Sequence, residues 1–285
     1  MGRVYGGYAV RGAQLCLIGG ACNVSAVARE LVPSEKEGKM YWSWFDLNWP
    51  WIGSVAALAL LLLLFATSIF RSDLSLSRWY DPVWLAWLAA PVYMIHNIEE
   101  YGIDLVGQRH AFPDVLCTTL GLGFYPACPI PPAFYLAVNI SLIWVVAPLA
   151  AMLSRRHPLG GLTFYGLVFI NGMTHVAPMI LGRGYNPGLL TAGLLFLPVS
   201  IWCARACFGP GRIPRKGIPI LIAAGVICHV ILLGSILLFI RGAFDDTVLV
   251  LLQLVNAAVF LAIPFLGERL VKPSHLAQRP GPGRL

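Results

Sequence analysis

The sequence predicts an all-α membrane protein, a polytopic bundle of about seven transmembrane helices. Of its 285 residues, 58 % are hydrophobic and only 12 % are charged, which does not match a soluble globular composition. Several apolar runs reach the roughly 20 residues that cross a hydrocarbon core about 30 Å thick. Backbone groups inside lipid must be satisfied locally, and stretches such as LALLLLLF lack the alternation of a β-barrel strand, so these runs are expected to be helices.

Seven segments are long and apolar enough to be spans. They are residues 49–70, 82–101, 132–153, 160–181, 188–207, 218–240 and 247–266. No internal repeat and no soluble insertion interrupts them, so one membrane domain over residues 40–268 is expected. The longest connection, residues 102–131, is rich in Gly and Pro and is predicted to be a folded cap rather than a helix.

The basic residues predict the orientation of the bundle. The net charge of +7 would suit nucleic-acid binding, but twelve Lys and Arg residues lie in four regions that follow alternate spans. The other connections hold one each, at Arg109, Arg183 and Arg241. By the positive-inside rule the basic regions and the C-terminus are cytoplasmic, and the first span begins outside. The expected partner is therefore the lipid bilayer, not nucleic acid.

The two ends of the chain are expected to lie outside the membrane domain. Residues 1–39 carry five basic residues on the predicted outer face, so they could be a weak signal-peptide core, a poor eighth span, or sequence upstream of a true start at Met40. The last is favoured, because Met40 opens the aromatic belt YWSWFDLNWPW. Residues 269–285 are predicted to form a disordered cytoplasmic tail.

Two cysteines, Cys117 and Cys128, lie eleven positions apart in the same predicted outer connection. They could form a disulfide if that compartment is oxidising, and the alternative is two free thiols in a buried loop. No CxxC pair occurs anywhere in the chain, so a zinc ribbon has no support.

A histidine and two adjacent glutamates end the second predicted span, in the stretch PVYMIHNIEEY. On a helix, Glu99 and Glu100 stand at i+3 and i+4 from His96, so both carboxylates flank the imidazole while pointing about 100° apart. One glutamate can then meet a metal or a reacting atom while the other anchors the histidine or a neighbouring helix. Ionisable groups in a membrane cost several kcal/mol unless paired, which favours a functional site over a structural polar network.

Polar residues of three predicted spans share one depth. At about 1.5 Å of rise per residue, His96 and His175 lie roughly 21 and 22 Å from the inner face. Asn139 lies roughly 20 Å from the same face. Asn171 is one turn below His175 on the same face of its helix. These matching depths predict one site in the outer half of the bilayer.

Further candidates surround this level. The loop of residues 182–188 is expected to close the outer end of the site, with Arg183, Tyr185 and Asn186 as substrate-binding residues alongside the two asparagines. His229 and Asn256, in the sixth and seventh spans, fall nearer the midplane. They are candidates for a lower wall, although a lone polar residue in a span is more often structural.

HNIEE, residues 96–100, together with NGMTH, residues 171–175, resembles the HXXEE family of small, largely bacterial integral membrane proteins. The resemblance covers roughly residues 80–260 and includes the Tyr-Asn-Pro-Gly loop that follows the second motif. It implies that the residues of the two motifs, including His96, Glu99, Glu100, Asn171 and His175, belong to one site. It also favours the bacterial cytoplasmic membrane. The family is catalogued by its motif rather than by a reaction, so the resemblance supplies no substrate.

Two mechanisms stay open. In the first, His96, His175 and one of Glu99 or Glu100 bind Zn²⁺ or Fe²⁺ and leave a coordination position for substrate, while the other glutamate supports the site or acts as general base. In the second, no metal is bound, and a buried glutamate protonates an olefin or epoxide with histidine as its proton partner.

The expected function is that of a membrane enzyme acting on a lipid-soluble or isoprenoid-like small molecule. Six histidines are too few for a membrane di-iron centre, and the EExxxR pattern of CAAX-type proteases fails because Asp104 stands where the Arg would be. A proton or divalent-metal transporter is an alternative, although no inverted repeat accompanies Pro91 and Pro178, which interrupt the motif helices. A non-catalytic membrane scaffold is the other alternative.

Overall fold

The computed structural model describes residues 43–271, and this part of the chain is helical throughout apart from its connections. The described residues contain no β-strand, only two isolated bridges between connecting segments. The all-α prediction is therefore confirmed. The expectations for residues 1–39, and for the tail beyond residue 271, concern segments outside the described residues.

Five helices are long and apolar enough to cross a membrane by length and composition. Three are single helices: α3 (Trp44–Ala66), α12 (Gly217–Ile240) and α13 (Asp246–Glu268). The fourth is continuous over α6 (Pro132–Asn139), η3 (Ile140–Val146) and α7 (Ala147–Leu153). The fifth is continuous over α10 (Leu189–Thr191), η4 (Ala192–Phe196) and α11 (Leu197–Cys207). These helices support the prediction of a membrane protein.

The other two predicted spans are helices as well. They form α4 (Pro82–Asn97), which continues into the π-helical turn η2 (Ile98–Gly102), and α9 (Thr163–Ile180). Both carry the polar residues of the two sequence motifs, which lower their hydropathy. The count of seven spans and the orientation of the bundle stay predictions.

The first helix begins and ends earlier than predicted. Ser43 and Asp46 form a capping box, in which the Ser43 hydroxyl accepts from the Asp46 amide at 3.1 Å and the Asp46 carboxylate accepts from the Ser43 amide at 2.6 Å. The helix ends at Ala66, so the predicted end at Phe70 was wrong.

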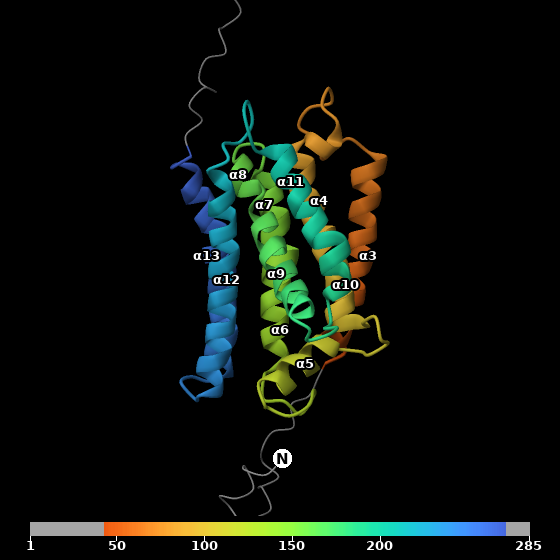
Figure 1. Cartoon of the computed structure of the whole chain (residues 1–285), viewed down its shortest axis with the longest axis vertical. Coiled ribbons are helices and arrows are strands. Elements are labelled where there is room, and N and C mark those ends of the chain that lie inside the picture. The colour runs from red at the N-terminus through yellow and green to blue at the C-terminus, as the bar shows by residue number, and fades with distance from the viewer. Residues whose placement is uncertain (1–42, 272–285) are drawn as a thin grey trace, which may run out of the picture. The chain divides into compact units, whose positions relative to one another are not determined.

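Helix α4 lies inside the bundle. Thirteen of its sixteen residues are buried, and it packs against α3 on one side and α7 and α9 on the other. Figure 1 shows α3 at one edge of the view and α12 and α13 at the opposite edge, with α4 and α9 between them. The two motif-bearing helices therefore lie between the more apolar ones in this view.

Helices α9 and α12 touch backbone to backbone. A Cβ atom at Gly166 would lie 1.9 Å from the carbonyl oxygen of Leu221, and one at Gly225 would lie 2.5 Å from the carbonyl oxygen of Gly166. Small residues at such crossings let membrane helices approach closely. This contact brings the middle of α12 next to the helix that carries the second motif.

The connection of residues 102–131 lies at the opposite end of the bundle from η1 (Arg78–Tyr80) and α8 (Pro158–Gly161), as Figure 1 shows. It contains the nine-residue helix α5 (Ala111–Thr119), so the prediction of a cap without a helix was wrong. A disulfide joins Cys117 of α5 to Cys128, with Cα atoms 5.9 Å apart. The disulfide alternative therefore holds, and it ties α5 to the segment that leads into α6.

Candidate functional site

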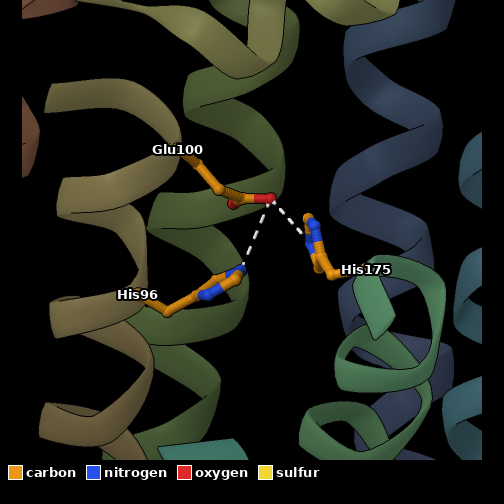
Figure 2. A group of neighbouring side chains, drawn as sticks. All are labelled: His96, Glu100 and His175. Atoms are coloured by element: carbon orange, nitrogen blue, oxygen red, sulfur yellow. Dashed lines mark ion pairs between the residues drawn. The ribbon is translucent and has the colours of Figure 1, made fainter. Parts of the chain in front are cut away.

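Three side chains from two helices converge inside the bundle. Nε2 of His96 and Nε2 of His175 lie 3.4 and 3.2 Å from the same carboxylate oxygen, Oε1 of Glu100. Figure 2 shows His96 and Glu100 pointing from α4 and η2 toward His175 on the facing helix α9. The three residues are 0, 3 and 4 % exposed, in the order His96, Glu100, His175. We refer to them as the triad.

π-Helical turns border this site on three sides. The turn η2 carries both glutamates, η3 begins directly after Asn139, and η4 begins directly after Thr191. Such turns are rare and occur frequently at functional sites. The helices α4 and α9 continue through Pro91 and Pro178, so the break in regular helix falls at the glutamates and not at the prolines.

The two adjacent glutamates face different neighbours. The carboxylate of Glu99 accepts hydrogen bonds from the backbone amides of Leu190 and Thr191 at 3.0 and 2.8 Å, and from the Thr191 hydroxyl at 2.6 Å. Those amides belong to the first turn of the helix that begins with α10, where unpaired N–H groups and the helix dipole favour a negative charge. Glu99 therefore caps a helix that is remote in sequence.

Tyr185 completes the environment of Glu99. Its hydroxyl donates to Glu99 Oε1 at 3.0 Å and accepts from the amide of Leu105 at 3.1 Å. Burial, assisted by the nearby Glu99 carboxylate, raises the pKa of Tyr185, so the phenol keeps its proton as a donor. With four donors around it, Glu99 is occupied by the helix cap and the loop.

The tautomer of His96 follows from its partner Thr191. The Thr191 hydroxyl lies 2.6 Å from Glu99 Oε2 and 2.7 Å from His96 Nδ1. Since a hydroxyl has one proton and the carboxylate can only accept, Thr191 donates to Glu99 and accepts from Nδ1–H of His96. The lone pair of His96 is then on Nε2, which has no hydrogen-bond partner among the described residues.

His175 is held in the same tautomer by Asn186. The Asn186 amide nitrogen donates to the carbonyl oxygen of His175 at 2.9 Å, which turns its Oδ1 toward Nδ1 of His175 at 2.7 Å. Nδ1 must then carry the proton. In their neutral forms both imidazoles present a bare Nε2 to Glu100 Oε1, so a proton or a cation is needed to pair these three atoms.

Gly188 lies against both imidazoles. It caps the helix that begins with α10 at φ +95°, and a Cβ atom there would lie 2.7 Å from Cε1 of His96 and 2.7 Å from Cε1 of His175. Both the left-handed backbone and the close approach require glycine. The segment that carries Asn186 and Thr191 is thus in direct contact with the triad through Gly188.

A cavity of about 430 Å³ adjoins the triad, within the usual range for small-molecule sites. Glu100 and His175 form part of its wall, and most of the remaining lining is aliphatic or aromatic. All five predicted substrate-binding residues line it, namely Asn139, Asn171, Arg183, Tyr185 and Asn186. The asparagines predicted from depth and the three loop residues therefore line one cavity, and their substrate-binding role stays a prediction.

The two candidates for a lower wall differ. His229 of α12 lines the cavity, whereas Asn256 is not among the lining residues and donates to the carbonyl of Cys228 at 3.0 Å. Sequence reasoning missed Thr191 and Gly188. The available signal was their position, a glycine and a polar residue at the start of a span directly after Asn-Pro, where a helix N-terminus needs capping.

The fold and site define a helical membrane protein with a buried His/Glu cluster. Residues 87–203 match the family described as "Protein of unknown function with HXXEE motif". The predicted resemblance is thus confirmed over a segment that runs from α4 to α11 and contains the triad, Glu99, Asn186 and Thr191. No curated protein and no solved structure matches the chain significantly.

Proposed function

We propose that the protein is a membrane-embedded metalloenzyme in which His96, Glu100 and His175 hold a zinc or ferrous ion. Its substrate would be a lipid-soluble, isoprenoid-like small molecule that enters the adjoining cavity. By the distribution of basic residues, the site would lie in the outer half of a bacterial cytoplasmic membrane. The observation that carries the proposal is the convergence of Glu100 Oε1 and the Nε2 atoms of His96 and His175 in one buried site.

The ligand set suits a divalent cation. Two histidines and one carboxylate hold catalytic zinc and non-haem iron in many proteins, with a coordination position left for substrate. Ligand atoms about 2.1 Å from a tetrahedral zinc ion are roughly 3.4 Å apart, close to the two Nε2–Oε1 distances of 3.4 and 3.2 Å. Among the described residues this is the one group of three or more such ligands whose atoms lie within 4.8 Å of one another.

A cation satisfies the triad better than a proton does. A proton between Glu100 Oε1 and one Nε2 leaves the other Nε2 facing an acceptor, at a cost of roughly 1–3 kcal/mol for an unsatisfied buried group. A cation in the centre satisfies all three atoms. The Thr191 and Asn186 hydrogen bonds are of the kind that orients metal-bound histidines through Nδ1.

The cavity then assigns roles to the other residues. A bound ion would supply a Lewis acid with a free position beside Glu100. The apolar walls exclude water and hold the hydrocarbon part of a substrate. Asn139 and Asn171 offer amide groups to its polar part, and the loop with Arg183 closes the cavity at its exposed end.

Elemental analysis of the purified protein tests the proposal. One equivalent of zinc or iron is expected in the wild type, and less than about a tenth of that in His96→Ala, Glu100→Gln and His175→Ala, because each variant removes one of three ligands. Asn256→Leu is the matched control. It removes a buried polar group of α13 outside the cavity and should keep the full metal content.

Three outcomes would argue against the enzyme. An active wild-type protein without stoichiometric metal would exclude the metal mechanism and support Glu/His acid–base chemistry. Metal flux into proteoliposomes that is lost in His175→Ala would support a transporter. Loss of folding in all three triad variants, with no metal in the wild type, would leave a structural polar network.

A further inference from the structure

Nε2 of His229, on the wall of the cavity, is a hydrogen-bond acceptor that the triad does not use. Nδ1 of this histidine lies 2.8 Å from the carbonyl oxygen of Gly225, one turn earlier in α12. A carbonyl only accepts, so Nδ1 carries the proton and the lone pair is on Nε2. Nε2 makes no hydrogen bond to the described residues, and His229 is a lining residue of the cavity.

A second acceptor lines the same cavity. The side-chain oxygen of Asn171 is buried and receives no hydrogen bond from the described residues. Helices α9 and α12 pack closely, and His229 lines the same cavity as His175 and Glu100. Two acceptors on adjacent helices therefore line one cavity and receive no hydrogen bond from the described residues.

The rest of the lining restricts what can supply that donor. An aliphatic and aromatic part of the wall comes from α5, α6, η3 and α12, and is formed by Leu116, Phe134, Val138, Leu142, Leu232 and Leu233. A carboxylate brings no donor, and a bare hydrocarbon, ester or ether has none. An ammonium group would be repelled by the cation of the proposed metal site. A neutral hydroxyl on an apolar body satisfies both walls.

We infer that the cavity binds a long-chain or isoprenoid-like alcohol, whose hydroxyl donates to Nε2 of His229 and whose hydrocarbon lies along the aliphatic wall. This rests on the proposed function, since it names the substrate class of the same cavity. His229 is then a binding residue that sets the position of the hydroxyl relative to the triad.

Photo-crosslinking with two matched probes tests this inference. One probe is a long-chain primary alcohol with a mid-chain diazirine, and the other is the methyl ether of that alcohol, which cannot donate. In nanodiscs, the alcohol should label peptides of α6 and α12 about tenfold more than the ether, the value for 1.4 kcal/mol from one buried hydrogen bond. Equal labelling by the two probes would overturn the inference.

Variants of His229 assign the effect to this residue. His229→Phe should reduce labelling by the alcohol to that by the ether, and His229→Gln, which keeps an acceptor, should restore most of it. His157→Phe, a histidine outside the cavity that pairs with Glu268, is the control and should label as the wild type does. Undiminished labelling of His229→Phe by the alcohol would show that His229 is not the acceptor of its hydroxyl. If that variant fails to fold, the two probes on the wild type still decide.

Metal content separates this inference from the proposed function. Wild-type protein that discriminates alcohol from ether but contains no metal would refute the metalloenzyme alone. Protein with stoichiometric metal that labels equally with both probes would refute the alcohol-binding inference alone.

Discussion

The helix pairs α12–α13 and α4–α9 both bury polar side chains in an apolar bundle, but different groups meet in the two pairs. Between α12 and α13, the amide nitrogen of Gln253 donates to the Ser235 hydroxyl at 2.7 Å, and that of Asn256 donates to the Cys228 carbonyl at 3.0 Å. Each contact joins a donor to an acceptor, while the side-chain oxygens of Gln253 and Asn256 receive no hydrogen bond from the described residues. Such pairs fasten helices together and need no ligand.

Between α4 and α9, two imidazole nitrogens and a carboxylate oxygen meet at one point. Both imidazoles place Nδ1–H on the outside, toward Thr191 and Asn186, and turn Nε2 toward Glu100. Burial alone does not separate a structural polar contact from a ligand site, since both pairs are buried. The arrangement of donors and acceptors distinguishes the two kinds of contact. Three variants test this distinction through their effects on metal binding and stability.

Gly188→Ala should have the largest effect. The new Cβ would lie 2.7 Å from both triad imidazoles and would force φ +95° on an alanine. We expect metal binding to be lost and the free energy of unfolding to fall by about 1–3 kcal/mol from backbone strain. Competition with a chelator and thermal unfolding in detergent measure the two quantities.

Gly182→Ala is the control for this change. It imposes the same kind of strain at φ +78° with no atom within 4 Å of the new Cβ. It should cost stability but keep the metal. Equal metal binding by both alanine variants would show that the close contact of Gly188 with the triad does not affect the site.

Thr191→Val should have an intermediate effect. The valine keeps the shape of the side chain but leaves Nδ1–H of His96 without an acceptor, and loss of such a partner typically lowers metal affinity about 10–100-fold. Glu99 keeps its two backbone donors, so the helix that begins with α10 stays capped. A metal titration measures the dissociation constant.

Thr118→Val provides the comparison for Thr191→Val. The Thr118 hydroxyl bonds only to backbone carbonyls of α5, so its loss should leave the metal affinity unchanged. An unaltered dissociation constant in Thr191→Val would mean that Thr191 does not fix the His96 tautomer.

Gln253→Leu should have the smallest effect. Hydrogen bonds between membrane helices average about 0.6 kcal/mol, so we expect a fall of about 1 kcal/mol or less in the free energy of unfolding and no change in metal content. A double-mutant cycle with Ser235→Ala gives the interaction energy. Loss of metal in this variant would mean that the α12–α13 contact is not purely structural and that the two helix pairs do not differ in this way.

Much of the site could be predicted from local patterns. Helix geometry puts Glu100 one turn after His96, and counting residues along the spans put His175 and Asn139 at the level of His96, with Asn171 one turn below. All of these line the cavity or belong to the triad. The adjacent glutamates were expected to do different jobs, but helix geometry did not indicate which would face the histidines.

The sequence by itself determined the class of the protein and the chemistry available to it, because span length and i, i+4 spacing are properties of neighbouring residues. Only the tertiary structure decided that Glu100 joins the histidines while Glu99 caps a helix whose first turn lies 92 positions away at Thr191. It also decided the tautomers of both histidines, through Thr191 and Asn186. These contacts are made by segments distant along the chain, so they form only when the helices pack.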